Sequence, residues 1–247
     1  MKSMLFTQEN LKKVFDQTKT VTRRTSGLQE INKQPNEWWL VASFDDNTLF
    51  RFGNDEKDRD LLIKPRYQAG ETVYIKEAWA VKRAYDDMKP SEIFPEYSPF
   101  IYYSDMEFNP MLVGRWRSPL FMPEWAARKF ATITEVSAGR VQEIKRDDAH
   151  REGILRFDRE HPDPVNGGVG HNRGASGLPM HYESIAAFMD LWNLRNAKPK
   201  PVKIKGIVDH FVSYPWEGKK EVREYRGKRW YVCGNPWVFR YGFKLKG

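Results

Sequence analysis

A short segment near the N-terminus concentrates the side chains best suited to chemistry. Residues 18–25 read Thr-Lys-Thr-Val-Thr-Arg-Arg-Thr and hold four hydroxyls and three cations. A lysine beside threonine hydroxyls can activate a nucleophile, and an arginine can hold a carbonyl or a phosphate. An exposed polar strand at the edge of a sheet has the same composition. The segment therefore supports both a functional site and a plain surface strand.

The surrounding sequence places this segment between a helix and a strand. Thr7 can cap a short helix that we expect to end near Thr18, and the β-branched residues 20–25 predict a strand. In an ideal strand Lys19 and Thr22 point to opposite faces. The two side chains can converge only if Lys19 belongs to the turn before the strand.

The net charge of +8 is concentrated in the last fifth of the chain. From Arg195 onward there are fourteen Lys and Arg against four Asp and Glu, and the preceding residues hold 27 basic and 29 acidic side chains. Aromatic residues alternate with these cations, as in Tyr225-Arg226 and Arg229-Trp230-Tyr231. Cations neutralise phosphates and rings stack on bases, which favours nucleic acid or a nucleotide-like ligand. A solvated basic surface is the alternative.

Composition excludes several classes of protein. With 40% hydrophobic and 14% aromatic residues the chain is globular, and no apolar run reaches the roughly 20 residues of a membrane helix. The start of the chain lacks the apolar segment of a secretory signal, so we expect a cytoplasmic protein. A single cysteine, Cys233, excludes an internal disulfide, and none of the five histidines forms a metal-binding pair. We therefore expect no metal, no cofactor and no membrane partner.

Hydrophobic periodicity predicts an α+β fold. The clearest helix is residues 182–195, with one apolar stripe, and the clearest strands are 71–79, 130–136 and 237–245. Further strands are expected at 38–42, 141–144, 202–212 and 222–233, and a short helix at 148–152, capped by Asp147 and ended by Gly153. Several scattered strands with three helices favour a small barrel with helices packed against it.

Four segments share the order and character of one protein family. They are Lys19-Thr20-Val21-Thr22-Arg23-Arg24, Tyr67 to Trp79, Trp116 to Ile154, and Phe188 to Trp192 with Asn235 to Val238. In this order they resemble the ASCH-domain family of the PUA-like superfamily, and most closely its bacteriophage and prophage members. The first segment is similar to the family's Gly-Arg-Lys-Thr-x-Thr-x-Arg signature, with Gln17-Thr18 in place of Gly-Arg.

The resemblance implies a single PUA-like domain over residues 1–247. Its core would be a small β-barrel with flanking helices and a cleft between the two. Residues near 27–60, 82–99, 157–179 and 198–232 would then be insertions into this domain.

The resemblance also implies an activity. Characterised small bacterial members are amidohydrolases that remove the acetyl group from N4-acetylcytidine, and their catalytic lysine, threonine and glutamate match Lys19, Thr22 and Glu152. Thr22 would attack the acyl carbonyl and Lys19 would take its proton. Glu152 would protonate the leaving amine and later activate water, and Arg24 or backbone N–H groups would stabilise the oxyanion.

The second segment supplies the remaining expected substrate-binding residues. These are Tyr74, Glu77 and Trp79, of which Tyr74 or Trp79 would stack on the base. Other relatives bind or cleave RNA, so two alternatives stay open. One is a non-catalytic module for RNA, rather than DNA, or for a modified base; the other is an RNA-cleaving enzyme that uses Lys19 and Glu152.

Overall fold

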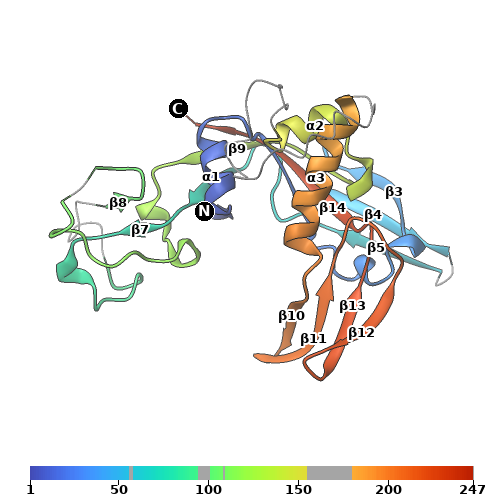
Figure 1. Ribbon diagram of the computed structural model, residues 1–247. Coiled ribbons are helices and arrows are strands. Elements are labelled where there is room, and N and C mark those ends of the chain that lie inside the picture. The colour runs from blue at the N-terminus through green and yellow to red at the C-terminus, as the bar shows by residue number, and fades with distance from the viewer. Residues whose placement is uncertain (56–57, 94–100, 108, 155–179, 247) are drawn as a thin grey trace.

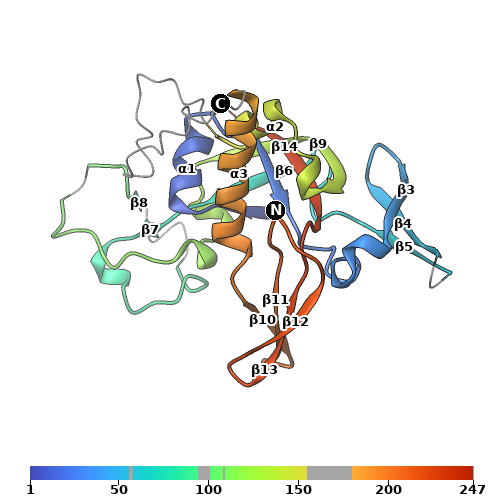
Figure 2. The ribbon, with the colours of Figure 1, turned by 45° about the vertical axis from the view of Figure 1, so that its right-hand side comes forward.

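The computed structural model describes residues 1–55, 58–93, 101–107, 109–154 and 180–246, and of residues 180–183 the backbone alone. The expected insertion at 157–179 lies outside these ranges. Among the described helices none is long and apolar enough to cross a membrane. Figures 1 and 2 show a central sheet with helices packed against it and smaller sheets around them.

The central sheet has five strands in the order β1-β6-β9-β14-β2. They are β1 (Lys2–Leu5), β6 (Thr72–Lys76), β9 (Phe130–Arg140), β14 (Trp237–Leu245) and β2 (Val21–Arg24). β1 runs parallel to β6, and the other neighbours are antiparallel. Together with the helices this confirms the predicted α+β class.

The strands expected to form a small β-barrel do not close into one in the described part of the chain, because β1 and β2 form the two ends of an open sheet. Each of these strands has only four residues, and helix α1 (Gln8–Phe15) lies between them in the chain. The gap between the two edges is bridged by a side chain: Arg24 donates to the carbonyl of Leu5 at 2.7 Å. α1 also places Leu11 and Val14 in the core beside the gap.

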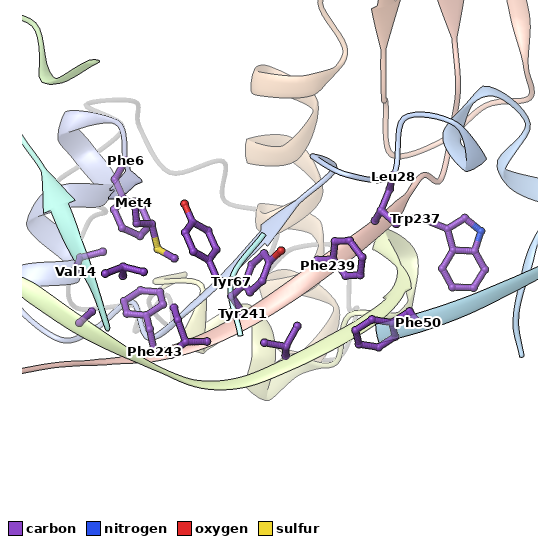
Figure 3. Close-up of a cluster of buried hydrophobic side chains, with 14 of the residues drawn as sticks. Met4, Phe6, Val14, Leu28, Phe50, Tyr67, Trp237, Phe239, Tyr241 and Phe243 are labelled. Carbon is purple, nitrogen blue, oxygen red and sulfur yellow. The ribbon is translucent and has the colours of Figure 1, made fainter. Parts of the chain in front are cut away.

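Alternation along β14 builds the main core. Its aromatic side chains, from Trp237 to Phe243, are buried on one face, as the sequence predicts. They pack against β1, α1 and β4 (Leu49–Asn54); Figure 3 shows them in a row above β9 and β14. Phe239 meets Phe50 with ring centroids 5.4 Å apart, and Tyr241 meets Tyr67 edge to face at 5.1 Å.

The opposite face of β14 carries the two other helices, α2 (Arg146–Arg151) and α3 (Met180–Asn196). Val238 packs with Ala149 of α2 and with Phe188 and Trp192 of α3. The predicted stripe of α3 is therefore core. Two local predictions are wrong: Lys145, not Asp147, precedes α2, and residues 141–144 do not extend the sheet.

Residues 141–143 form a 3-10 helix because a local side chain ends β9. The Glu143 carboxylate accepts a hydrogen bond from the backbone N–H of Arg140 at 2.9 Å. This bond satisfies an N–H that would otherwise need a neighbouring strand. Other 3-10 helices are Ile31–Lys33, Pro35–Glu37, Arg83–Tyr85, Pro119–Phe121 and Glu124–Ala126.

The expected insertions near 27–60, 82–99 and 198–232 contain folded elements in their described parts. The first holds β3 (Trp39–Phe44) and β4, which pair with β5 (Arg59–Ile63) in one antiparallel sheet. The second insertion, near 82–99, lies between β7 (Trp79–Ala80) and β8 (Tyr102–Tyr103) in the chain, and these two strands pair with each other in a short antiparallel ladder.

The third insertion is a four-stranded sheet that projects beyond the end of α3 in both views (Figures 1 and 2). Its strands are β10 (Lys200–Ile204), β11 (Ile207–Ser213), β12 (Glu221–Tyr225) and β13 (Lys228–Val232), in the order β10-β11-β13-β12. The strands predicted at 202–212 and 222–233 thus each divide into an antiparallel hairpin, and β11 joins β13 in parallel.

Truncation of Phe239 tests whether the aromatic row holds the fold together. Its ring is fully buried, so Phe239→Ala removes buried apolar area and leaves a cavity. We expect the free energy of unfolding to fall by about 3–5 kcal/mol in urea titrations. Phe121→Ala is the matched control, since Phe121 is 63% exposed, and should change it by less than about 0.5 kcal/mol. Equal effects of the two variants would contradict this account of the core.

Candidate functional site

A cavity of about 540 Å³ lies at the outer edge of β2. Lys19, Thr22 and Arg24 line it from the β2 segment, and Glu152 lines it from the end of α2. Phe6, Thr7 and Asn10 contribute from the start of α1, and Phe188, Trp192 and Arg195 from α3. Its size is in the range of ordinary small-molecule sites.

Lys19 reaches this cavity because it precedes β2. Its N–H donates to the carbonyl of Lys13 in α1 at 2.9 Å, and it forms an isolated antiparallel bridge with Glu152. The next N–H, that of Thr20, donates to the carbonyl of Arg151 at 2.8 Å. The condition for Lys19 and Thr22 to share one site is therefore met.

Lys19 and Glu152 form a buried ion pair. The Nζ of Lys19 donates to the backbone carbonyl of Glu152 at 2.9 Å and to its carboxylate Oε2, and the two side chains are 3% and 6% exposed. Gly153 makes the approach possible. Its φ of +84° suits glycine, and a Cβ there would meet the Cβ of Lys19 at 3.2 Å and the side chain of Lys13 at 2.9 Å.

Burial lowers the pKa of Lys19 below its ordinary value of 10.5. The neighbouring carboxylate of Glu152 acts in the opposite direction, whereas the charges of Arg24 and Arg195 lower the pKa further. Lys19 thus loses its proton more readily than a solvated lysine, as a general base requires. Two of the three ammonium donors are occupied by Glu152, which leaves one for a ligand or a neighbouring hydroxyl.

Arg23 fixes the other oxygen of the Glu152 carboxylate. It donates to Glu152 Oε1 at 3.0 Å and to Asp148 Oδ2 at 2.7 Å. Asp148 also accepts two hydrogen bonds from Arg240 of β14, at 2.9 and 2.8 Å. The sequence did not predict this role of Arg23. The spacing of Asp148 and Glu152, four residues apart along one helical turn, is the signal that could have shown it.

Thr22 lies in β2 opposite Tyr241 of β14 and is 5% exposed. Its side chain lines the cavity from β2. A hydroxyl in this position can attack a bound ligand.

Arg24 is the one of the four expected substrate-binding residues that lines the cavity. Besides its bond to Leu5, its guanidinium lies 5.3 Å from the centre of the Phe6 ring. Tyr74, Glu77 and Trp79 lie elsewhere, because β6 is separated from β2 by β9 and β14.

These three residues have structural partners instead. The hydroxyl of Tyr74 donates to the carbonyl of Met122 at 3.4 Å. Glu77 holds Arg128 through two hydrogen bonds of 2.9 and 2.7 Å. Trp79 is fully buried, with Arg117 5.6 Å from its ring and Trp125 at 5.8 Å. They attach the β7–β8 segment to the body of the molecule and do not face the cavity.

Several cavity residues escaped the sequence analysis. Arg195 and Lys200 belong to the basic region noted in the sequence, but nothing in its pattern distinguishes them from the other cations. Asn10 and Phe6 carry no signal either, since both belong to or flank an ordinary amphipathic helix. In the described part of the chain no group of three or more His, Cys, Asp or Glu side chains is placed to hold a metal ion.

Comparison of the chain with protein-family models, with curated proteins and with solved structures found no match. The geometry of the cavity is therefore the basis for assigning a function.

Neutralising Asp148 tests the network that holds Glu152. Burial acts to raise the pKa of Asp148, but the hydrogen bonds and charges of Arg240 and Arg23 outweigh it and lower the pKa below 3.8. A lowered pKa stabilises the fold above that pH, and this stabilisation is lost as the pH falls through the folded-state pKa. Asp148→Asn should therefore lower the free energy of unfolding by about 1–3 kcal/mol near neutral pH.

The difference between wild type and Asp148→Asn should shrink as the pH falls from 3.8 through the lower folded-state pKa of Asp148, because the wild-type carboxylate then becomes neutral like the asparagine. Urea titrations over a series of pH values measure it. Asp147→Asn, at the exposed neighbouring position, is the control and should have little effect. A difference that stays constant down to acid pH would show that Asp148 does not act through its charge.

Proposed function

We propose that this protein is an amidohydrolase that removes an acyl group from the exocyclic amine of a cytosine nucleoside, and that its fold is PUA-like. The observation that supports the activity is the presence of Lys19, Thr22 and Glu152 on the wall of one cavity. The five-stranded mixed sheet, with α1 between its two edges, is compatible with the fold.

The buried pair supplies both an acid and a base for the first step. A proton passes within the pair from Lys19 to Glu152, along the hydrogen bond between Nζ and Oε2. Lys19 Nζ then takes the proton of Thr22 Oγ1 as that oxygen bonds to the acyl carbon. Glu152 protonates the amine nitrogen as the C–N bond breaks. The free amine departs, and the acyl group remains as an ester on Thr22.

The second step reverses these roles. The Glu152 carboxylate takes a proton from water as the water oxygen attacks the ester carbon. The Lys19 ammonium returns a proton to Thr22 Oγ1 as the ester C–O bond breaks. A carboxylic acid is released, and the pair is again an amine and an acid.

The rest of the wall suits a flat heterocycle. Phe6, Phe188 and Trp192 give it apolar surface, and the amide of Asn10 offers a donor and an acceptor for the edge of a base. The indole N–H of Trp192 donates to the carbonyl of Tyr214 at 2.8 Å, which fixes the ring in place. Such a pocket combines apolar contact with a few polar groups that orient the ligand.

One observation favours a second candidate, a non-catalytic module for RNA or a modified base. Among the described residues, the cavity is lined by five cations, namely Lys19, Arg23, Arg24, Arg195 and Lys200, and by one carboxylate, that of Glu152. A polymer binder uses such an excess to neutralise phosphates, and its affinity falls steeply with salt.

Substitution of Thr22 gives the cleanest test of the hydrolase. Variants of Lys19 or Glu152 leave a buried charge without its partner, which costs about 3–5 kcal/mol of stability, whereas Thr22→Val keeps the size of the side chain. We expect Thr22→Val to reduce kcat for acetate release from N4-acetylcytidine on the order of 10³-fold or more. Thr22→Ser, which keeps a hydroxyl, should retain measurable activity.

Thr20→Val is the matched control, since Thr20 belongs to the same segment but does not line the cavity. It should retain wild-type activity. Equal rates for Thr22→Val and Thr20→Val would remove Thr22 from the mechanism. A wild-type protein that binds the nucleoside but releases no acetate would favour the second candidate.

The pH dependence tests the role of Lys19. The first step needs the proton that the pair shares, so kcat/KM should fall as the pH rises through the pKa of Lys19, which lies below 10.5. Arg195 lowers that pKa, so Arg195→Gln should raise it and move the alkaline limb to higher pH. Arg223→Gln, on the exposed strand β12, should leave the limb unchanged. If Arg195→Gln leaves the alkaline fall of kcat/KM at the same pH as in the wild type, the assignment of Lys19 is contradicted.

A further inference from the structure

Three of the cavity cations come from different elements and take no part in the proposed proton transfers. Arg24 lies in β2, Arg195 is in the last turn of α3, and Lys200 begins β10. All three line the cavity. We call them the basic cluster.

Within the described residues, the partners of the basic cluster do not fully neutralise its charge. Arg24 donates to the Leu5 carbonyl at 2.7 Å, and Lys200 donates to the amide oxygen of Asn196 at 2.9 Å. Arg195 has one carboxylate within reach, that of Glu9 at 3.4 Å, which Lys13 shares at 3.5 Å. Arg23 on the neighbouring position differs, because two carboxylates hold it at 3.0 and 2.7 Å.

The cations of the cluster also repel one another. Burial lowers the pKa of Lys200, and the charge of Arg24 lowers it further. Burial and the charge of Arg195 both act to lower the pKa of Arg24. Three cations held together in a partly buried cavity repel one another and destabilise the fold unless an anion binds between them. A single arginine can bind a phosphate through two parallel hydrogen bonds. The hydroxyls of Thr25 and Ser26, on the same wall, can add donors.

The cluster and the catalytic pair contact different turns of α1. The backbone N–H of Lys19 donates to the carbonyl of Lys13, and the guanidinium of Arg195 donates to the hydroxyl of Thr7 at 3.3 Å. Six residues of helix separate these two points by roughly 9 Å. A nucleotide has a similar length from the exocyclic amine of its base to its 5′-phosphate. Because the catalytic pair and the basic cluster line the same cavity of about 540 Å³, one ligand of this size can contact both.

We propose that Arg24, Arg195 and Lys200 form a phosphate-binding subsite, so that the ligand is a phosphorylated cytidine rather than a free nucleoside. This inference rests on the proposed function for the nature of the base, but the phosphate subsite has its own test. The phosphate belongs either to a free nucleotide or to a nucleotide within RNA, and the two sources can be separated by experiment.

Calorimetric titration with three ligands tests the subsite without any catalysis. The ligands are cytidine, cytidine 5′-monophosphate, and a hexacytidylate that has internal phosphodiesters but no terminal phosphate. We expect the monophosphate to bind at least about 10-fold more tightly than cytidine, because hydrogen bonds to charged groups are worth that much. Equal affinity for cytidine and both phosphate-bearing ligands would overturn the proposal. A preference for the monophosphate identifies a free nucleotide, and a preference for hexacytidylate with strong salt dependence identifies RNA; both support the subsite.

Substitutions then locate the phosphate. Lys200→Gln and Arg195→Gln should each remove most of the preference for the phosphate-bearing ligand and leave the affinity for cytidine within about 2-fold. Lys203→Gln is the matched control, since Lys203 lies on the same strand and is exposed but does not line the cavity. A loss of preference in Lys203→Gln equal to that in Lys200→Gln would show general attraction to a basic surface and overturn the subsite.

Failure of this inference is distinguishable from failure of the proposed function. Cytidine and its monophosphate are not acylated, so their binding does not depend on Thr22. Equal binding of the two ligands together with acetate release that requires Thr22 would reject the phosphate subsite alone. Selective binding of the phosphate-bearing ligand without acetate release would reject the hydrolase alone.

Discussion

A buried lysine and a buried glutamate, distant in sequence, must be joined before the rest of this site can exist. Taking Lys19 and Glu152 out of water is costly, and their attraction offsets that cost only when further hydrogen bonds satisfy both groups. Two further hydrogen bonds meet this condition. The backbone carbonyl of Glu152 accepts from Lys19, and Arg23 holds the second carboxylate oxygen. Gly153 then allows the two chain segments to approach.

The same network connects the site to the sheet. Asp148 stands between Arg23 of β2 and Arg240 of β14, two strands whose backbones already pair at these two arginines. Helix α2 is thereby anchored across both strands by charge, while its Ala149 packs with Val238. Glu152 occupies the end of that helix, so its position depends on the ion pairs of Asp148 as much as on its own. The charged network thus positions the acid and base that the proposed hydrolase would use.

The sequence predicted elements with strong periodicity and failed where tertiary contacts decide. The alternating aromatic residues of 237–245 correctly predicted a strand, and the apolar stripe of α3 correctly predicted a helix, because each pattern fits one buried face. Lys19, Thr22 and Glu152 came from the family resemblance, and periodicity alone would not have paired Lys19 with Glu152. Trp79 was misplaced because a tryptophan in a strand looks the same whether it meets a ligand or a neighbouring Arg117. Sheet closure depends on edge pairing, which local sequence does not encode.

The missing closure is what makes the cavity available. In a closed barrel a further backbone ladder would join β1 and β2 and fill the outer edge of β2. Here that edge is bordered by the side chains of Phe6, Asn10 and Arg24. Because Arg24 bridges the gap by one hydrogen bond to Leu5 and not by a ladder, its guanidinium stays at the cavity wall. A short edge strand that ends the sheet thus gives one residue two roles, since the side chain that ties β1 to β2 also presents its charge to a ligand.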